Sequence, residues 1–305
     1  MYFYIGESQS RTNDGDSVIS IGDEITQEEV DTLNKAFSIT GYYHAITQIR
    51  NIVIENGLEF QRWMKPDNLQ VHRDAGTSSS RLIMLSNKLA LNYASSIKTF
   101  IDMTQRLLKH RKPDAVKEFL KLTNKFYDEK MEYRFWANFR NYIVHCSFPY
   151  CVFHEAVGSN CEIRCPRDHL LEFDNWKHSR ADIEKMPEFV DLPGLVDEMS
   201  SLIHALYLQF FYYLASDIFA EYNLYKEFTK KHSAQCTVIF KTEKPISKED
   251  GFVVPSMQPL PIKEMMDVFK TMNEHPSKNI KMLIDLTQQA TISCNRPRYW
   301  TALMR

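Results

Sequence analysis

Two side chains near the middle of the chain have the chemistry needed to cleave RNA without a metal ion. Arg140 is followed directly by Asn141 and, five positions after the arginine, by His145. Arginine stays cationic at physiological pH and binds phosphate through paired hydrogen bonds, whereas histidine exchanges a proton near neutral pH. A cation on the phosphate and an acid or base beside it can support attack by a ribose 2′-hydroxyl. Arg140, Asn141 and His145 are therefore the candidate catalytic residues.

The spacing between this arginine and this histidine is weak evidence by itself. The same spacing separates Arg164 from His169, where Pro166 and strand-prone neighbours disfavour a helix. An arginine and a histidine near a helix C-terminus can also be structural, because they bind terminal carbonyl groups and favour the helix dipole. The local context therefore has to support a catalytic interpretation.

A helix over residues 127–146 is predicted to position the candidate residues. Its apolar side chains recur with a helical period, at Met131, Phe135, Phe139, Tyr142 and Ile143. Pro149 ends the helix, since the residue before a proline disfavours helical dihedral angles. The polar residues of such a helix must point to water or to polar partners.

Four of these polar residues, Arg134, Asn138, Asn141 and His145, are spaced so that they share one helix face. Helical geometry places them within about 60° of one another. Arg134 and Asn138 are therefore candidate substrate-binding residues. Arg140 lies about 140° around the helix from His145. Either its long side chain curls back, or the site is assembled from two protomers.

The rest of the chain predicts further helices and a few strands. Thr26 and Glu29 have the pattern of a capping box, at the start of a helix that extends to about residue 63 with a break near Gly41. Ser78 and Pro113 can begin two more helices. Other predicted elements are a short strand and a polar loop through residue 22, a hairpin at about 150–166, a long helix over 195–230, strands at 237–240 and 251–255, and a helix over 262–273.

These elements indicate a mainly α protein: a helical bundle with a β-hairpin insertion and a small mixed α/β C-terminal region. We expect an N-terminal helical extension over residues 1–76, a helical domain over 77–232 and the mixed region over 233–305. The dense apolar residues of 195–230 predict a helix that is buried on most sides or that shares a dimer interface.

The motif resembles that of the HEPN domains (higher eukaryotes and prokaryotes nucleotide-binding), all-helical modules with an Arg-x4-6-His signature. The matching residues are Arg140, Asn141 and His145, and residues 81–111 are similar to the first core helix of that family. The resemblance covers about residues 78–230 and implies a HEPN-like helical bundle.

HEPN proteins are commonly metal-independent endoribonucleases of toxin–antitoxin, anti-phage and CRISPR systems, and they usually dimerise so that two motifs line one cleft. The resemblance implies that Arg140 neutralises the scissile phosphate, that His145 transfers protons and that Asn141 positions the phosphate or the imidazole. It also makes Asp102, on the first core helix, a candidate substrate-binding residue. A toxin subgroup has a tyrosine two positions after the histidine for regulatory modification; Ser147 at that position argues against such control.

The resemblance implies RNA as the substrate, a homodimer, and an antitoxin or other regulatory protein as a further partner. It leaves open an alternative, in which the same fold binds nucleotide or RNA without cutting it and regulates a partner.

Composition restricts these interpretations. The net charge is -2, so contact with RNA would depend on a local basic patch. No apolar run approaches the roughly 20 residues of a transmembrane helix, and the first residues lack the pattern of a secretory signal. We therefore expect a cytoplasmic protein without membrane contact. The 6 cysteines include no Cys-x2-Cys pair, so we expect reduced thiols, no metal site and no cofactor.

Overall fold

The computed structural model describes residues 1–10, 17–156, 159–232, 236–246, 256–277 and 300–304. The chain divides into two compact units. The helical unit comprises residues 45–210, and the terminal unit comprises residues 1–44 together with 211–305. Both ends of the chain therefore belong to the same unit.

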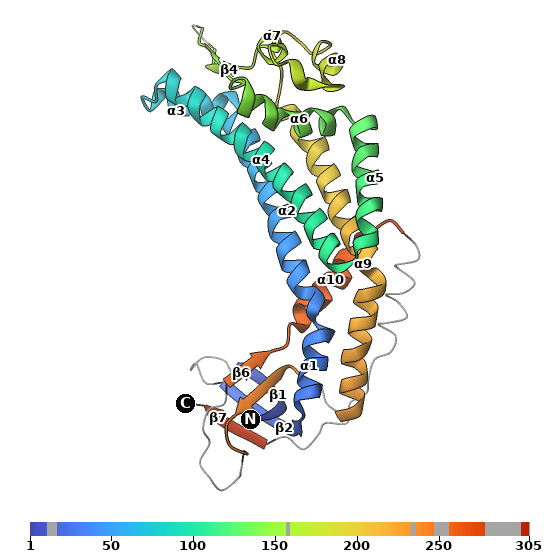
Figure 1. The fold of residues 1–305 in the computed structure, drawn as a ribbon. Helices are drawn as coiled ribbons and strands as arrows, with labels where there is room; N and C mark the ends of the chain where they lie inside the picture. The colour runs from blue at the N-terminus through green and yellow to red at the C-terminus, as the bar shows by residue number, and fades with distance from the viewer. Residues whose placement is uncertain (11–16, 157–158, 233–235, 247–255, 278–299, 305) are drawn as a thin grey trace. The chain divides into compact units, whose positions relative to one another are not determined.

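Long helices make up most of the helical unit (Figure 1). They are α4 (Ser79–Arg111), α5 (Pro113–Glu129), α6 (Met131–His145) and the parts of α2 (Ser38–Trp63) and α9 (Val196–His232) that fall in this unit. The α4 helix packs against α5 and α6, and α5 packs against α6. Shorter elements complete the unit: α3 (Pro66–Asp74), β3 (Val152–His154), β4 (Glu162–Arg164), α7 (Arg167–Leu171), η1 (Asp174–Trp176), α8 (Ser179–Ile183) and η2 (Pro193–Leu195).

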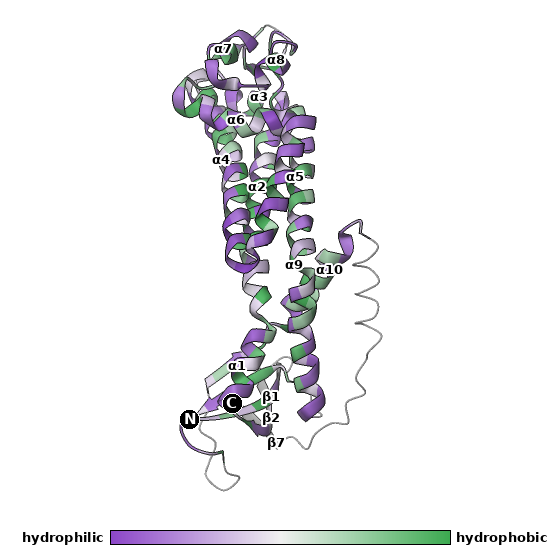
Figure 2. Ribbon diagram, turned by 45° about the vertical axis from the view of Figure 1, so that its right-hand side comes forward, coloured by the Kyte–Doolittle hydropathy of each residue, from purple (hydrophilic) through white to green (hydrophobic). Residues whose placement is uncertain are grey.

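The helices of this unit begin at residues suited to a helix N-terminus. The Ser78 side chain accepts a hydrogen bond from the backbone nitrogen of Arg81 at 3.3 Å and so caps α4. Pro66 and Pro113 stand in the first turns of α3 and α5, where the missing N–H has no helical partner to lose. Hydrophilic residues lie on the outer faces of α4 and α5 (Figure 2), as amphipathic helices around one core require.

Aromatic side chains form the core around α6. The buried Trp136 ring packs edge-on against Tyr93 of α4, with ring centroids 4.8 Å apart. On the other side of the helix, Phe135 and Tyr142 stack on the buried Trp176 at 5.4 and 5.5 Å. Stacked and edge-to-face pairs add to the energy of apolar burial. These contacts fix α6 between α4 and η1.

The terminal unit contains an antiparallel sheet. Its described strands run in the order β6-β5-β1-β2-β7. They are β1 (Tyr2–Ser10), β2 (Ser17–Ile25), β5 (Val238–Thr242), β6 (Ser256–Pro259) and β7 (Trp300–Met304). The β1–β2 register shifts beside Gly6, where a Cβ would overlap the ring of Phe240 and the carbonyl oxygen of Ser20. That close approach requires glycine.

Helices α1 (Gln27–Ala36) and α10 (Ile262–Glu274) belong to the same unit. Thr26 and Glu29 form the predicted capping box of α1: the Glu29 backbone nitrogen donates to Thr26 Oγ1 at 3.2 Å, and the Thr26 backbone nitrogen donates to Glu29 Oε2 at 2.8 Å. Among the described helices, none is long and apolar enough to cross a membrane.

The structure confirms a mainly helical class with a small antiparallel sheet, and it corrects several details. The helix break lies at Phe37 rather than near Gly41, because the Glu221 carboxylate accepts hydrogen bonds from the Ser38 hydroxyl at 2.6 Å and the Ile39 backbone nitrogen at 3.0 Å and so holds the start of α2 there. Residues 17–25, expected to lie mostly in a polar loop, form β2. The predicted hairpin is present, with Val152 opposite Arg164, whereas the strand predicted at 251–255 lies outside the described residues.

The division into units differs from the three successive regions expected from the sequence. The first strands pair with β5, on the far side of the helical unit in the sequence, so residues 1–44 and 211–305 cluster together. Hydrogen bonding between the two ends of the chain produces this arrangement, and no local sequence pattern encodes it.

Candidate functional site

The candidate residues lie on α6, whose burial pattern separates them into two groups. Asn138 is buried and Arg134 is half-buried, whereas Arg140, Asn141 and His145 are exposed. The helix ends at His145, and the Cys146 backbone nitrogen closes its last turn by donating to the Tyr142 carbonyl oxygen at 2.8 Å.

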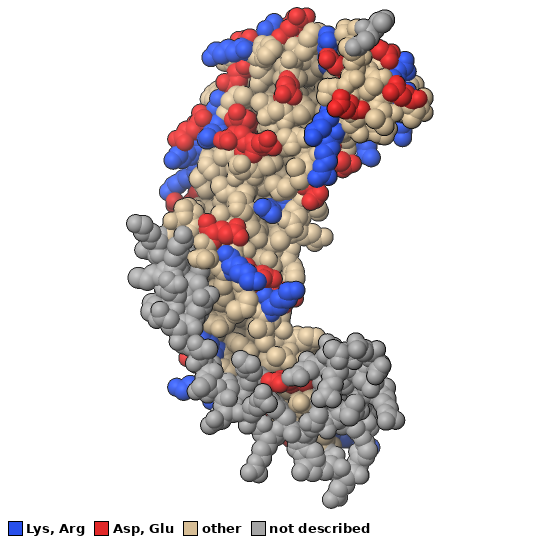
Figure 3. Space-filling model, turned by 180° about the vertical axis from the view of Figure 1, so that it is seen from behind, with Lys and Arg blue, Asp and Glu red and all other residues tan. Residues whose placement is uncertain are grey.

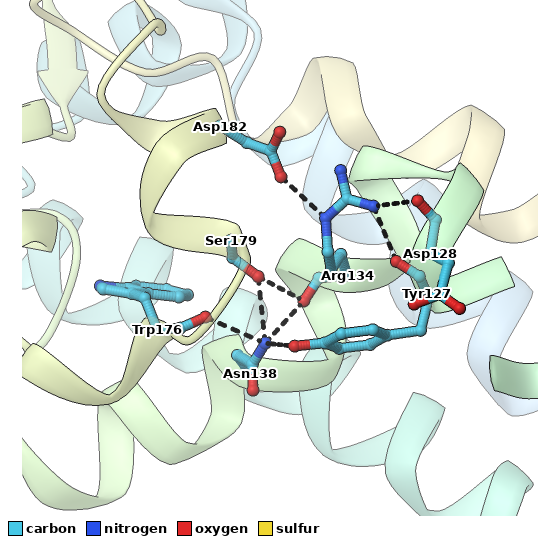
Figure 4. A network of polar contacts seen from close by, with 7 residues as sticks. All are labelled: Tyr127, Asp128, Arg134, Asn138, Trp176, Ser179 and Asp182. Atoms are coloured by element: carbon cyan, nitrogen blue, oxygen red, sulfur yellow. Dashed lines mark hydrogen bonds and ion pairs between the residues drawn. The ribbon is translucent and has the colours of Figure 1, made fainter. Parts of the chain in front are cut away.

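Arg134 is occupied by structural partners (Figure 4). Its Nε donates to Asp182 Oδ2 at 2.8 Å, and its Nη1 donates to the backbone carbonyl oxygens of Tyr127 and Asp128 at 2.7 and 2.8 Å. These two carbonyls lie in the last turn of α5, where a cation is favourable. The guanidinium therefore ties α6 to the end of α5 and to α8.

Asn138 belongs to the same network. Its Nδ2 lies 3.0 to 3.4 Å from four oxygens that share its two hydrogens: Ser179 Oγ, the Trp176 carbonyl, Tyr127 Oη and the Arg134 carbonyl. The amide is buried, so these bonds replace water. We had expected Arg134 and Asn138 to bind substrate. The structure instead places both side chains in contacts that hold η1 and α8 against α6.

Arg140 and Asn141 line a pocket of about 260 Å³ between α4, α5 and α6. The pocket walls are mostly apolar and aromatic: Ile97, Ile101, Tyr127, Tyr133, Trp136, Ala137 and Met199. The Arg140 and Asn141 side chains make no hydrogen bond or ion pair within the part of the chain that the structure describes. Both are therefore available to a ligand, and sequence reasoning did not foresee the pocket they line.

Asp102 lies beside this pocket on α4. Its carboxylate is exposed and accepts a hydrogen bond from Lys98 at 2.5 Å, and Lys98 is one of the residues that line the pocket. An exposed ion pair of this kind is weak and exchanges readily with water or with a ligand. The predicted substrate-binding residue Asp102 is therefore near Arg140, although its carboxylate would repel a phosphate.

His145 does not line the pocket of Arg140 and Asn141. Five residues of helix separate it from Arg140 by about 7.5 Å along the axis and about 140° around it. The imidazole is exposed and makes no hydrogen bond or ion pair with the described residues. Two apolar neighbours, Val144 and Phe148, are 53% and 52% exposed. One copy of the chain therefore presents the arginine and the histidine on different faces.

Tyr142, inside the motif, has a structural position that the sequence did not reveal. Its ring is 0% exposed, and its hydroxyl is buried without a hydrogen-bond partner among the described residues. Burial raises the pKa of this phenol far above its ordinary value, so the group stays neutral. Tyr142 is a core residue, and its hydroxyl weakens the core because it has lost water without gaining a partner.

We therefore expect Tyr142→Phe to stabilise the protein by about 1 kcal/mol, since it removes a buried unsatisfied hydroxyl and keeps the ring. Urea unfolding measures this. Tyr93→Phe is the matched control, because the Tyr93 hydroxyl donates to the Val196 carbonyl oxygen at 3.2 Å and its loss should destabilise by about 1 kcal/mol. A lower stability for Tyr142→Phe would contradict the interpretation that the Tyr142 hydroxyl is buried without a hydrogen-bond partner.

The described residues contain no group of three or more His, Cys, Asp or Glu side chains placed to hold a metal ion. All the described cysteines are free thiols. Cys161, Cys165 and Cys236 are buried, whereas Cys146 and Cys151, which border the end of α6, are exposed. Partial loss of contact with water and the negative charges of Glu172 and Asp174 raise the pKa of the Cys146 thiol, which lowers its fraction of reactive thiolate.

The charged side chains of the helical unit form a mixed surface. On the face shown in Figure 3, lysines and arginines lie among aspartates and glutamates. Contact with a polyanion on such a surface depends on individual cations in favourable positions rather than on a broad basic field. Arg140 is a cation of this kind.

The fold and the site define a mainly helical protein in which one helix presents to solvent an arginine, an asparagine and a histidine that make no hydrogen bond or ion pair with the described residues. Comparisons with models of protein families, with curated proteins and with solved structures found no match to this chain.

Proposed function

We propose that the protein is a metal-independent endoribonuclease that cleaves RNA by attack of the 2′-hydroxyl on the adjacent phosphate. Arg140 binds the scissile phosphate, Asn141 orients it, and His145 of a second copy moves the proton. The reaction would leave a 2′,3′-cyclic phosphate. The resemblance to HEPN domains supports this proposal and suggests a role as a toxin or anti-phage effector.

The proposal rests on the difference between the polar residues of α6 that have structural partners and those that are exposed. Its other polar residues, Arg134 and Asn138, are held by structural partners, whereas Arg140, Asn141 and His145 remain exposed and unpaired. Exposed polar groups without partners cost little in stability and stay free for a ligand. Among the described residues, Arg140 and His145 bind no terminal carbonyl group of α6, as the structural interpretation of the motif would require.

Assembly from two copies is supported by the surface around His145. Since Arg140 and His145 point to different faces of one helix, an imidazole from another chain is the most direct partner for a phosphate bound by Arg140. Val144 and Phe148 flank His145 with more than half of their surface exposed. Exposed apolar residues of this size are enriched where proteins associate, so this end of α6 suits a homodimer contact.

The second candidate function is a non-catalytic module that binds nucleotide or RNA. It is favoured by the pocket itself, which contains Arg140 and Asn141 with aromatic walls but lacks His145. A single chain thus has the groups for anion and base binding without the group for proton transfer.

Incubation of the purified protein with mixed RNA in excess EDTA distinguishes the two. We expect cleavage, with 2′,3′-cyclic phosphate ends on the products, and no cleavage of DNA of matched sequence, because DNA lacks the attacking hydroxyl. Tight RNA binding without cleavage would instead support the module. Cleavage that requires added Mg²⁺ would contradict both the chemistry and the roles of Arg140 and His145.

A further inference from the structure

The pocket beside Arg140 has features that a phosphate site does not need. Arg140 and Asn141 line it together with the partly exposed ring of Tyr127 and with Tyr133 and Trp136, which are almost fully buried. Asn124, an exposed amide on α5, adds a second side chain that can both donate and accept hydrogen bonds. A phosphate alone requires cations and donors, so aromatic walls next to amides indicate a planar, partly polar ligand.

The size of the pocket limits that ligand. Its volume of about 260 Å³ lies below the roughly 300–1,000 Å³ typical of pockets for drug-sized molecules. One heterocyclic base fits such a space, whereas a stacked base pair does not. Its lining comes from α4, α5 and α6 and from Met199 of α9, and the aromatic core fixes the packing of α6 on α4, so the pocket is largely formed before a ligand binds.

We propose that this pocket receives one unpaired RNA base next to the phosphate that Arg140 binds, and that the protein therefore acts on single-stranded RNA. The inference deepens the proposed function and rests on it. The ring of Tyr127 and the apolar walls contact the faces of the base, and the amides of Asn124 and Asn141 reach its polar edge. Arg140 lies at the same pocket and binds the phosphate attached to that base.

A base inside an RNA duplex cannot enter the pocket. The major groove of duplex RNA is too deep and narrow for side chains to read, so proteins that recognise RNA sequence mostly bind loops and single strands, whose bases can leave the stack. Insertion of a base also turns the attached backbone away from helical geometry. A single strand permits this rotation, and a duplex opposes it with the energy of stacking and pairing.

A base with an adjacent phosphate could come from an RNA chain or from a free nucleotide. The proposed function favours RNA, because the phosphate at Arg140 then belongs to a phosphodiester, and His145, which lies outside the pocket at an exposed helix end, can reach the phosphodiester of a second copy. Competition by mononucleotides separates the two sources.

The test uses the full chain with His145→Ala, which binds without cutting, and measures affinity for a labelled single strand and for a duplex of the same sequence. Ala137→Leu is then added, since Ala137 is an exposed helical residue that lines the pocket and a leucine there fills it. We expect single-strand affinity to fall roughly 10-fold, in line with the loss of base stacking on aromatic side chains, and duplex affinity to stay unchanged.

Ala220→Leu is the matched control, because Ala220 is an exposed helical residue in the terminal unit. Equal effects of Ala137→Leu and Ala220→Leu on single-strand affinity would overturn the inference, as would equal binding of single strand and duplex. Displacement of RNA by mononucleotides at similar concentrations would assign the pocket to a free nucleotide and also overturn it. In the protein with His145 intact, cleavage in EDTA that Ala137→Leu leaves unchanged would leave the nuclease proposal intact while removing the base pocket.

Discussion

Replacement of either Arg140 or His145 by alanine is expected to lower the rate of RNA cleavage in EDTA by about 10²- to 10⁴-fold, the usual contribution of one acid, base or charge-stabilising group. Both side chains are exposed and make no bonds with the described residues, so their removal should leave the fold intact. Circular dichroism and the urea unfolding midpoint verify this. The loss of activity then reports chemistry rather than stability.

Mixing the two inactive variants tests where the groups come from. In a mixed dimer, one site combines Arg140 of the subunit that carries His145→Ala with the intact His145 of its partner, and the other site lacks both groups. Random exchange between dimers should therefore restore about a quarter of the wild-type rate, as the symmetry of a two-site dimer requires. Each variant alone stays inactive at the same total concentration.

Two further variants serve as controls for this experiment. His44→Ala removes an exposed imidazole and Arg106→Ala removes an exposed guanidinium, and neither residue lies on α6. Both should cleave at the wild-type rate. If mixing restores nothing while the single variants are inactive and dimeric, then the arginine side chain curls back to the histidine of its own chain, and the composite site is wrong.

The sequence predicted the helices well because their signals are local. Thr26 with Glu29, Ser78 and Pro113 each start a helix through contacts within one turn, and Pro149 follows the end of α6. A pattern that depends on neighbours a few residues apart can be read without knowledge of the fold.

Long-range pairing was not predictable in this way. The sheet of the terminal unit joins β1 to β5, with Tyr2 opposite Thr242, and no local pattern in either strand identifies its partner. The partners of Arg134 and Asn138 come from Asp182 and Ser179, more than 40 residues along the chain. Helical periodicity placed all four polar residues on one face, but only the tertiary fold decided which of them were covered.

The division between covered and uncovered residues on α6 leads to a second large effect. We expect Asn138→Ala to destabilise the protein by about 2–4 kcal/mol, since it leaves buried acceptors unpaired at about 1–3 kcal/mol each. Those acceptors include Ser179 Oγ at 3.0 Å and the Trp176 carbonyl oxygen at 3.4 Å. Urea unfolding measures the loss, and RNA affinity below the unfolding transition should change by less than about threefold.

Asn141→Ala, on the same helix, is the matched variant with the opposite expected result. Its amide is exposed, so its removal should change stability by no more than about 0.5 kcal/mol. RNA binding and cleavage should fall, because Asn141 lines the pocket beside Arg140. The same substitution at two asparagines three positions apart would thus distinguish Asn138, which stabilises the fold, from Asn141, which binds RNA. If the Asn138→Ala protein were stable but bound RNA much more weakly, Asn138 would be an RNA-binding residue. That result would contradict the structural role proposed for it.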